Sequence, residues 1–177
     1  LKENKPDLAI KIYNSLLQLD KQDDIAYILA DGYTFLSKAH TKKKNFKLAT
    51  KYLDSARAQA AISENVSHLF SIASQQANIY KEKRQLNLGI SALTTILNRQ
   101  DLKPFQESQK ELFKELYELY KLNNDHEKAL AALKTHYKIK DSLRVILQKN
   151  KFNVIQSEFN YNELSAKLET RNAQLQV

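Results

Sequence analysis

Small, apolar and polar residues alternate along the chain in a pattern that repeats every forty positions. Three columns of residues recur at i, i+4 and i+7 within each repeat. The columns contain Ala9, Ala49, Gly89 and Ala129, then Tyr13, Leu53, Leu93 and Leu133, and then Leu16, Ala56, Ile96 and His136. Because residues at these spacings share one face of a helix, the pattern predicts an amphipathic helix in each repeat.

A second helical face precedes each of the last three small residues. It contains Tyr33, Leu36, Ser37 and His40, then Ala73, Gln76, Ala77 and Tyr80, and then Phe113, Leu116, Tyr117 and Tyr120. The sequence predicts turns between the two faces near Lys42–Asn45, Glu82–Gln85 and Leu122–Asp125. Each repeat is therefore predicted to be a helical hairpin, and stacked hairpins would bury a continuous apolar core.

These columns resemble the tetratricopeptide repeat (TPR), whose first helix carries large, Leu, small and aromatic positions and whose second carries small, large and small ones. The resemblance covers roughly residues 6–140. It implies an all-α, right-handed superhelix, or solenoid, of helical hairpins that are about forty residues long. The alternative is an ordinary helical bundle in which the periodicity is a coincidence.

The chain departs from the family at Gln76, at Tyr117 and in its period, which exceeds the family's roughly 34 residues. We expect the extra residues between repeats, with Pro104 in the first turn of a helix. The array begins at the second helix of a unit, around Pro6–Gln18, so we expect its partner helix upstream.

The C-terminal part has no Gly or Pro from Asp125 to Val177. The forty-residue register places a repeat junction near Ile139–Leu143, where Asp141 or Ser142 would begin a new helix. We therefore predict a repeat array over residues 1–141 and, after a short break, one long helix of about 35 residues over 142–177.

Two apolar stripes run along this predicted helix. One has coiled-coil spacing and gives the candidate dimer seam Val154, Tyr161, Leu164, Leu168 and Leu175. The other contains Phe152, Ile155 and Phe159 and is expected to pack against the last repeat. The pattern fits both a homodimer through the C-terminal helix and a helix that only caps the array.

The sequence of residues 112–175 shows a second resemblance. It includes the run that starts at Glu118 and the predicted helix Phe159–Leu175. It is similar to the end of TPR sensor regions in bacterial signalling proteins. There the repeats precede a helical linker, usually a membrane span, and then a histidine kinase or a LuxR-type output. The resemblance implies the sensor domain of a two-component or related regulator. It favours the periplasmic side of a membrane-anchored protein and leaves the cytoplasm open.

Composition agrees with an all-α chain, because only 2 Gly and 2 Pro occur among 177 residues and β-rich folds need such residues in tight turns. The net charge of +8 favours acidic partners. Six lysines gather between residues 38 and 51 and form either a solvated helix end or a phosphate-binding patch: Lys38, Lys42, Lys43, Lys44, Lys47 and Lys51. No apolar run approaches the roughly 18 residues of a membrane span.

No arrangement of residues indicates catalysis. Cysteine is absent, which removes disulfides, thiolate metal sites and cysteine nucleophiles. No two of the histidines His40, His68, His126 and His136 have helical metal spacing with an acidic third partner. Gly32 and Gly89 stand alone, so no phosphate-binding loop is predicted. We therefore expect a non-enzyme with no cofactor and no bound metal.

The TPR resemblance implies where a ligand would bind, because the first helix of each hairpin lines the concave face in that family. The inward positions are Asp31, Thr34 and Lys38, then Ser71, Ser74, Asn78 and Lys81, and then Glu111, Lys114, Glu118 and Lys121. This polar surface of mixed charge suits an extended peptide. It resembles the family's carboxylate clamp only in Asn78, since Ser74 stands where the clamp has a lysine.

The sequence thus predicts a protein- or peptide-binding scaffold. One alternative is a nucleic-acid-binding helical array that uses the cluster Lys38–Lys51, and nucleic acid is the less favoured partner. The other alternative is a purely structural assembly scaffold.

Overall fold

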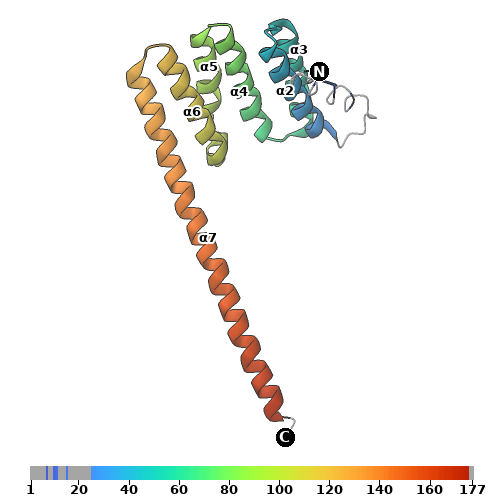
Figure 1. Cartoon of the computed structure of the whole chain (residues 1–177), viewed down its shortest axis with the longest axis vertical. Helices are drawn as coiled ribbons and strands as arrows, with labels where there is room; N and C mark the ends of the chain where they lie inside the picture. The colour runs from blue at the N-terminus through green and yellow to red at the C-terminus, as the bar shows by residue number, and fades with distance from the viewer. Residues whose placement is uncertain (1–6, 8–9, 12–14, 16–24, 176–177) are drawn as a thin grey trace, which may run out of the picture. The chain divides into compact units, whose positions relative to one another are not determined.

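In the computed structural model, residues 7, 10–11, 15 and 25–175 are described, and every element from residue 26 onward is a helix (Figure 1). The elements are α2 (Ala26–Lys42), α3 (Phe46–Ser63), α4 (Ser67–Glu82), α5 (Leu86–Leu97), the 3-10 helix η2 (Gln100–Leu102), α6 (Gln106–Leu122) and α7 (His126–Leu175). The all-α class predicted from the sequence is confirmed for this part of the chain. The column residues Ala9, Tyr13 and Leu16 lie outside the described residues.

The turns inside the hairpins repeat one geometry every forty residues. Helices α3, α5 and α7 begin at Phe46, Leu86 and His126. Two residues before each start, Lys44, Arg84 and Asn124 adopt the same left-handed backbone conformation, with φ of 59°. The next N–H in each turn bonds to a carbonyl five residues earlier, at 2.8 to 3.0 Å. The forty-residue period is therefore present in the backbone, at the turns that the sequence predicted.

Small residues stand where the two helices of a hairpin approach most closely. A Cβ atom added at Gly89 would lie 3.2 Å from the backbone oxygen of Ala77 and 3.3 Å from the Leu119 side chain. Ala49 and Ala129, which occupy the same column, are also buried. Larger residues beside this contact, Leu53 and Leu93 among them, fill the two apolar clusters of the core.

Successive hairpins differ in the length of their second helix and in the connection that follows it. Helix α3 has 18 residues, whereas α5 has only 12 and is followed by η2. Leu102 in η2 is 1% exposed, which anchors this connection in the core. Pro104 does not lie in the first turn of a helix as predicted, because α6 begins at Gln106 after the N-cap Phe105. The connection, and not the start of α6, absorbs the extra length.

Helix α7 is continuous from His126 to Leu175, so the break predicted near Ile139–Leu143 is wrong. Asp141 does not cap a new helix and instead lies 3.6 Å from Arg144, one turn further along the same helix. The physical reason is that this stretch contains no residue that interrupts the hydrogen bonds of a helix. At 50 residues, α7 is about 75 Å long.

The chain divides into two compact units, Leu1–Tyr137 and Lys138–Val177. In the second unit the side chains of Phe152, Ile155 and Phe159 are 64%, 64% and 66% exposed, and their packing against the last repeat stays a prediction. None of the helices that the structure describes combines the length and the apolar character needed to cross a membrane.

Replacing Ala49 by Leu should lower the free energy of unfolding by about 1–3 kcal/mol, because its side chain is fully buried and an added isobutyl group would overpack the hairpin. Ala58→Leu on the same helix is the matched control, since Ala58 is exposed, and should change stability by less than about 0.5 kcal/mol. Urea unfolding measures both. Equal unfolding midpoints would contradict the placement of the small column.

The left-handed turn residues give a second prediction. Arg84 has a φ of 59°, where a side chain costs energy that glycine avoids, so Arg84→Gly should stabilise the protein by about 0.5–1 kcal/mol. Lys83, the neighbouring C-cap with a φ of −83°, is the control. Lys83→Gly should reduce stability, because glycine there only adds entropy to the unfolded chain. A loss of stability in Arg84→Gly would contradict the turn geometry.

Candidate functional site

A cleft of about 500 Å³ lies along the first helices of successive hairpins, α2, α4 and α6. Side chains from all three helices line it. They are Phe35, Lys38, Ala39 and Lys42 from α2, Ser74, Gln75, Ala77, Asn78 and Lys81 from α4, and Glu115, Glu118 and Leu119 from α6. Ser74, Asn78 and Lys81 are spaced four and three apart, which places them on one face of α4.

The apolar part of the cleft combines a buried floor with an exposed aromatic ring. Ala39, Ala77 and Leu119 are buried in the helix packing. Phe35 is 46% exposed, and the ammonium group of Lys38 lies 5.3 Å from the centre of its ring. This distance allows a cation–π interaction that holds the lysine at the rim. The cleft thus offers an apolar contact surface directly beside a positive charge.

A buried polar network connects α4 to α2 beneath the cleft. The Gln75 amide donates hydrogen bonds to Ser37 Oγ at 2.9 Å and to Thr41 Oγ1 at 3.0 Å. All three side chains are at most 1% exposed. Buried amides and hydroxyls without partners would be costly, so these bonds fix how the two helices pack. Asn78, one turn along, places its side-chain nitrogen 3.5 Å from the Gln75 oxygen and faces the cleft.

Glu115 connects α6 to α4 on the wall of the cleft. Its carboxylate accepts a hydrogen bond from Ser74 Oγ at 2.6 Å. Burial raises the pKa of Glu115 above its usual value, whereas the Ser74 hydrogen bond and the charges of Lys38 and Lys81 lower it. Because burial is the largest of these effects, the charged form of Glu115 is disfavoured. Three lysines, Lys38, Lys42 and Lys81, and a second acid, Glu118, line the same cleft.

The structure brings together some of the residues predicted for the concave face. Five of them line the cleft: Lys38, Ser74, Asn78, Lys81 and Glu118. The others are not among its lining residues: Asp31, Thr34, Ser71, Glu111, Lys114 and Lys121. Thr34 in particular is buried and bonds to the Ala30 carbonyl, so it is not part of an accessible inner wall.

Sequence reasoning missed Phe35, Lys42, Gln75, Glu115 and Leu119. Lys42 lay within the basic cluster, and Glu115 was an unremarked acid on a predicted helix. These residues belong to the site because they lie next to helices some forty residues away in the chain. The sequence gives no direct signal for such contacts.

The six lysines between residues 38 and 51 are divided among different surroundings. Lys38 and Lys42 line the cleft, whereas Lys47 and Lys51 line a shallow depression on α3. Lys43 pairs with Asp7, and Lys44 pairs with Glu82 at the end of α4. Two of the six lysines are thus paired with carboxylates, and the other four are divided between two hollows.

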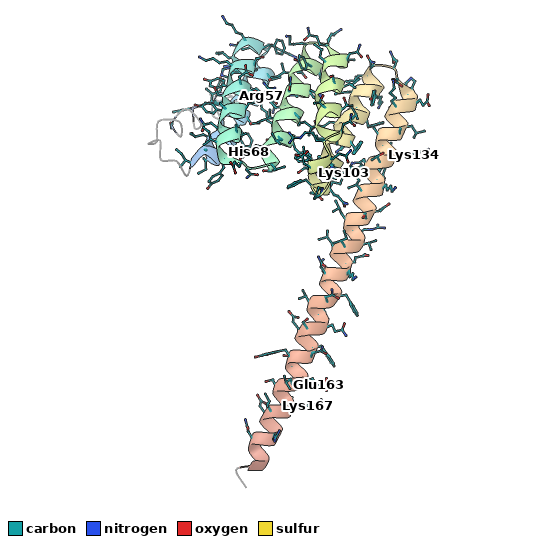
Figure 2. All side chains as sticks on the ribbon, turned by 180° about the vertical axis from the view of Figure 1, so that it is seen from behind. Arg57, His68, Lys103, Lys134, Glu163 and Lys167 are labelled. Carbon is teal, nitrogen blue, oxygen red and sulfur yellow. The ribbon has the colours of Figure 1, made fainter. Side chains whose placement is uncertain are left out.

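His68, labelled in Figure 2, lies in the first turn of α4 and contacts side chains of α2 and α3. It is 4% exposed, with Nδ1 3.2 Å from Ser63 Oγ and Nε2 3.5 Å from Asp31 Oδ1. Ser63 Oγ also lies 3.3 Å from the Ala60 carbonyl, in the last turn of α3. The buried imidazole thus finds polar partners on α3 and α2, which satisfies both of its ring nitrogens.

Two further histidines, His136 and His40, are half-buried between helices, whereas His126 is exposed at the start of α7. His136 Nδ1 lies 2.9 Å from the Lys110 carbonyl and joins α7 to α6. His40 stacks on Tyr52 with ring centres 5.3 Å apart, and burial, with a smaller contribution from Lys43, lowers its pKa. Within the described part of the chain, no three His, Asp or Glu side chains gather closely enough to hold a metal ion.

Comparisons of the chain with known protein families, with curated proteins and with solved structures find no match. The repeat geometry and the chemistry of the cleft are therefore the basis for a functional conclusion.

The raised pKa of Glu115 predicts a dependence of stability on pH. A raised pKa in the folded state means that Glu115 contributes stability below its ordinary pKa of about 4.3 and loses it as pH rises through the raised value. Glu115→Gln keeps an acceptor for Ser74 without the charge, so its Tm should increasingly exceed that of the wild type as pH rises. Glu118→Gln, at an exposed position of the same helix, controls for the loss of one negative charge.

Proposed function

We propose that this chain is a scaffold of the tetratricopeptide kind, whose cleft along α2, α4 and α6 binds a peptide or a segment of a protein. Two observations support the assignment to this class. The columns of small and large residues recur every forty positions, and the hairpin turns recur with the same φ at Lys44, Arg84 and Asn124. A right-handed superhelix of such hairpins places its first helices on the concave side, and the cleft lies along these helices.

The observation that carries the proposal is the chemistry of the cleft. Three lysines, Lys38, Lys42 and Lys81, line the same cleft as the half-buried Glu115, and the charges of Lys38 and Lys81 act on its carboxyl group. Phe35 and Leu119 offer apolar contacts beside them. A peptide that brings a carboxylate next to an apolar side chain would satisfy both features, and Asn78 would bind its backbone.

We further propose that the scaffold is the sensory or interaction region of a bacterial signal-transduction regulator. This part rests on the resemblance of residues 112–175 to the TPR sensor regions of such proteins. Helix α7 contains the second helix of the last hairpin and continues to Leu175. Ligand binding that changes the packing of the hairpins would therefore act on a helix that leads out of the repeat array.

Selection of a random peptide library displayed on phage against the whole chain tests the proposal. Selected peptides should be rich in Asp or Glu next to an apolar residue and should bind with micromolar Kd. The triple variant Lys38→Ala, Asn78→Ala and Lys81→Ala should weaken that binding at least about tenfold, because it removes two charges and an amide from the cleft.

Lys114→Ala is the matched control, because Lys114 is an exposed lysine of α6 that does not line the cleft. It should leave the Kd unchanged, and all variants should keep the Tm of the wild type within a few degrees. Undiminished binding by the folded triple variant would move the site elsewhere and overturn the proposal. Failure to select any peptide, together with salt-dependent binding of a labelled single-stranded RNA, would favour the nucleic-acid alternative.

A further inference from the structure

We infer that the unit Lys138–Val177 pairs with a second copy of this chain as an antiparallel coiled coil, whatever ligand the cleft binds. Large apolar side chains stand exposed on this helical unit at regular intervals. Leu147, Val154, Tyr161 and Leu168 are between 53% and 73% exposed. A row of exposed apolar side chains of this length marks a surface of interaction.

These four residues form one column of a coiled-coil seam. They lie seven residues apart. Four positions before each of them stands a member of a second column, which contains Leu143, Asn150, Ser157 and Leu164. Two columns with this offset make the contact face of a coiled coil, and four successive heptads are enough to sustain one. The seam has apolar ends and a polar middle.

The polar members of the second column decide the direction of pairing. In a parallel, in-register pair each residue meets its own copy, so Asn150 and Ser157 would face themselves. Arg171, the next member of the column, would face another Arg171. In an antiparallel pair the first column of one copy faces the second column of the other. Asn150, Ser157 and Arg171 then no longer face their own copies.

One antiparallel register matches large residues at both ends. It places Leu147 opposite Leu164 of the second copy and Leu168 opposite Leu143. Tyr161 then lies opposite Asn150, where its hydroxyl can bond to the amide. In the same register Val154 lies opposite Ser157, so each polar residue meets a larger partner. No member of the seam from Leu143 to Leu168 faces its own copy.

The charges along the helix favour the same direction. Residues 138–151 carry five basic side chains and one acidic one, whereas residues 152–175 carry three acidic and two basic ones. Antiparallel pairing puts the basic half of one copy beside the acidic half of the other, and parallel pairing puts the basic halves together. The register above also brings Lys151 next to Glu158 of the second copy, twice by symmetry.

Lys151 and Glu158 are available for this contact, because both are exposed and neither has an ion-pair partner among the described residues. Other charges of the unit pair within the helix. Lys167 lies 2.6 Å from Glu163 (Figure 2), and Arg144 lies 3.6 Å from Asp141.

The stripe Phe152, Ile155 and Phe159 lies on the opposite side of the helix from this seam, since its members are offset by one or five positions from the first column. Large apolar residues continue on this face only from Val145 to Phe159, and the next position of the same column is the small Ala166. This length is about two heptads, which is short for a coiled coil. The seam that continues to Leu168 is therefore the one that pairs.

Sedimentation equilibrium of the full chain tests the seam and the register. The wild type should be a dimer, and Leu164→Asp should dissociate it, whereas Ile155→Asp should not. At low ionic strength Lys151→Glu and Glu158→Lys should each raise the dimer Kd at least about fivefold, and the double variant should recover the wild-type value. The inference would be overturned by a monomeric wild type. It would also be overturned if Ile155→Asp dissociated the dimer and Leu164→Asp did not, or if the two charge reversals weakened the dimer additively in the double variant.

Distances between spin labels test the direction of pairing. The chain has no cysteine, so Glu169→Cys provides a single labelled site on the outer side of the helix. In the antiparallel register, residue 169 lies beside residue 142 of the second copy. The two labels would then be about 40 Å apart, at 1.5 Å per residue. A parallel pair would place them within roughly 25 Å, since paired helices lie 8–10 Å apart and the labels add to this. The shorter distance would overturn the inference.

Discussion

The close approach of two helices within each hairpin is the constraint on which the rest of the repeat array depends. At Gly89 the space beside the backbone is so small that even a methyl group would meet the Ala77 carbonyl at 3.2 Å. Ala49 and Ala129, at the same positions of the neighbouring hairpins, are also buried. Because the turns also repeat one geometry, the hairpins follow each other in register, and their first helices come to lie along a common cleft.

Contacts between hairpins add polar constraints to this apolar packing. Gln75 bonds to two hydroxyls of α2, and Glu115 of α6 accepts a hydrogen bond from Ser74 of α4. These bonds satisfy buried polar groups, which would otherwise be costly, and they fix α2, α4 and α6 relative to one another. Lys38 and Lys81 are thereby held along the same cleft as Glu115.

The unit Lys138–Val177 lacks such internal constraints, because a single helix cannot bury its own apolar side chains. Leu147, Val154 and Leu168 remain more than half exposed along its length. The inferred pairing with a second copy would bury them, and the arrangement of charges on the same helix favours one direction of pairing over the other. Packing within the hairpins and pairing of the helix are thus separate sources of stability.

The sequence by itself determined the helical hairpins, their forty-residue period and the position of their turns, because Ala49, Gly89 and Ala129 act through local spacing on a helix. It also placed Lys38, Ser74, Asn78, Lys81 and Glu118 on the helices that line the cleft. The continuity of α7 past Asp141 follows from a stretch without helix breakers, which the forty-residue register alone misread. Only the tertiary structure decided that Pro104 precedes α6 and that Gln75 and Glu115 belong to the site. The roles of Gln75 and Glu115 depend on burial and on hydrogen bonds between helices some forty residues apart. The periodicity of the sequence does not indicate those contacts.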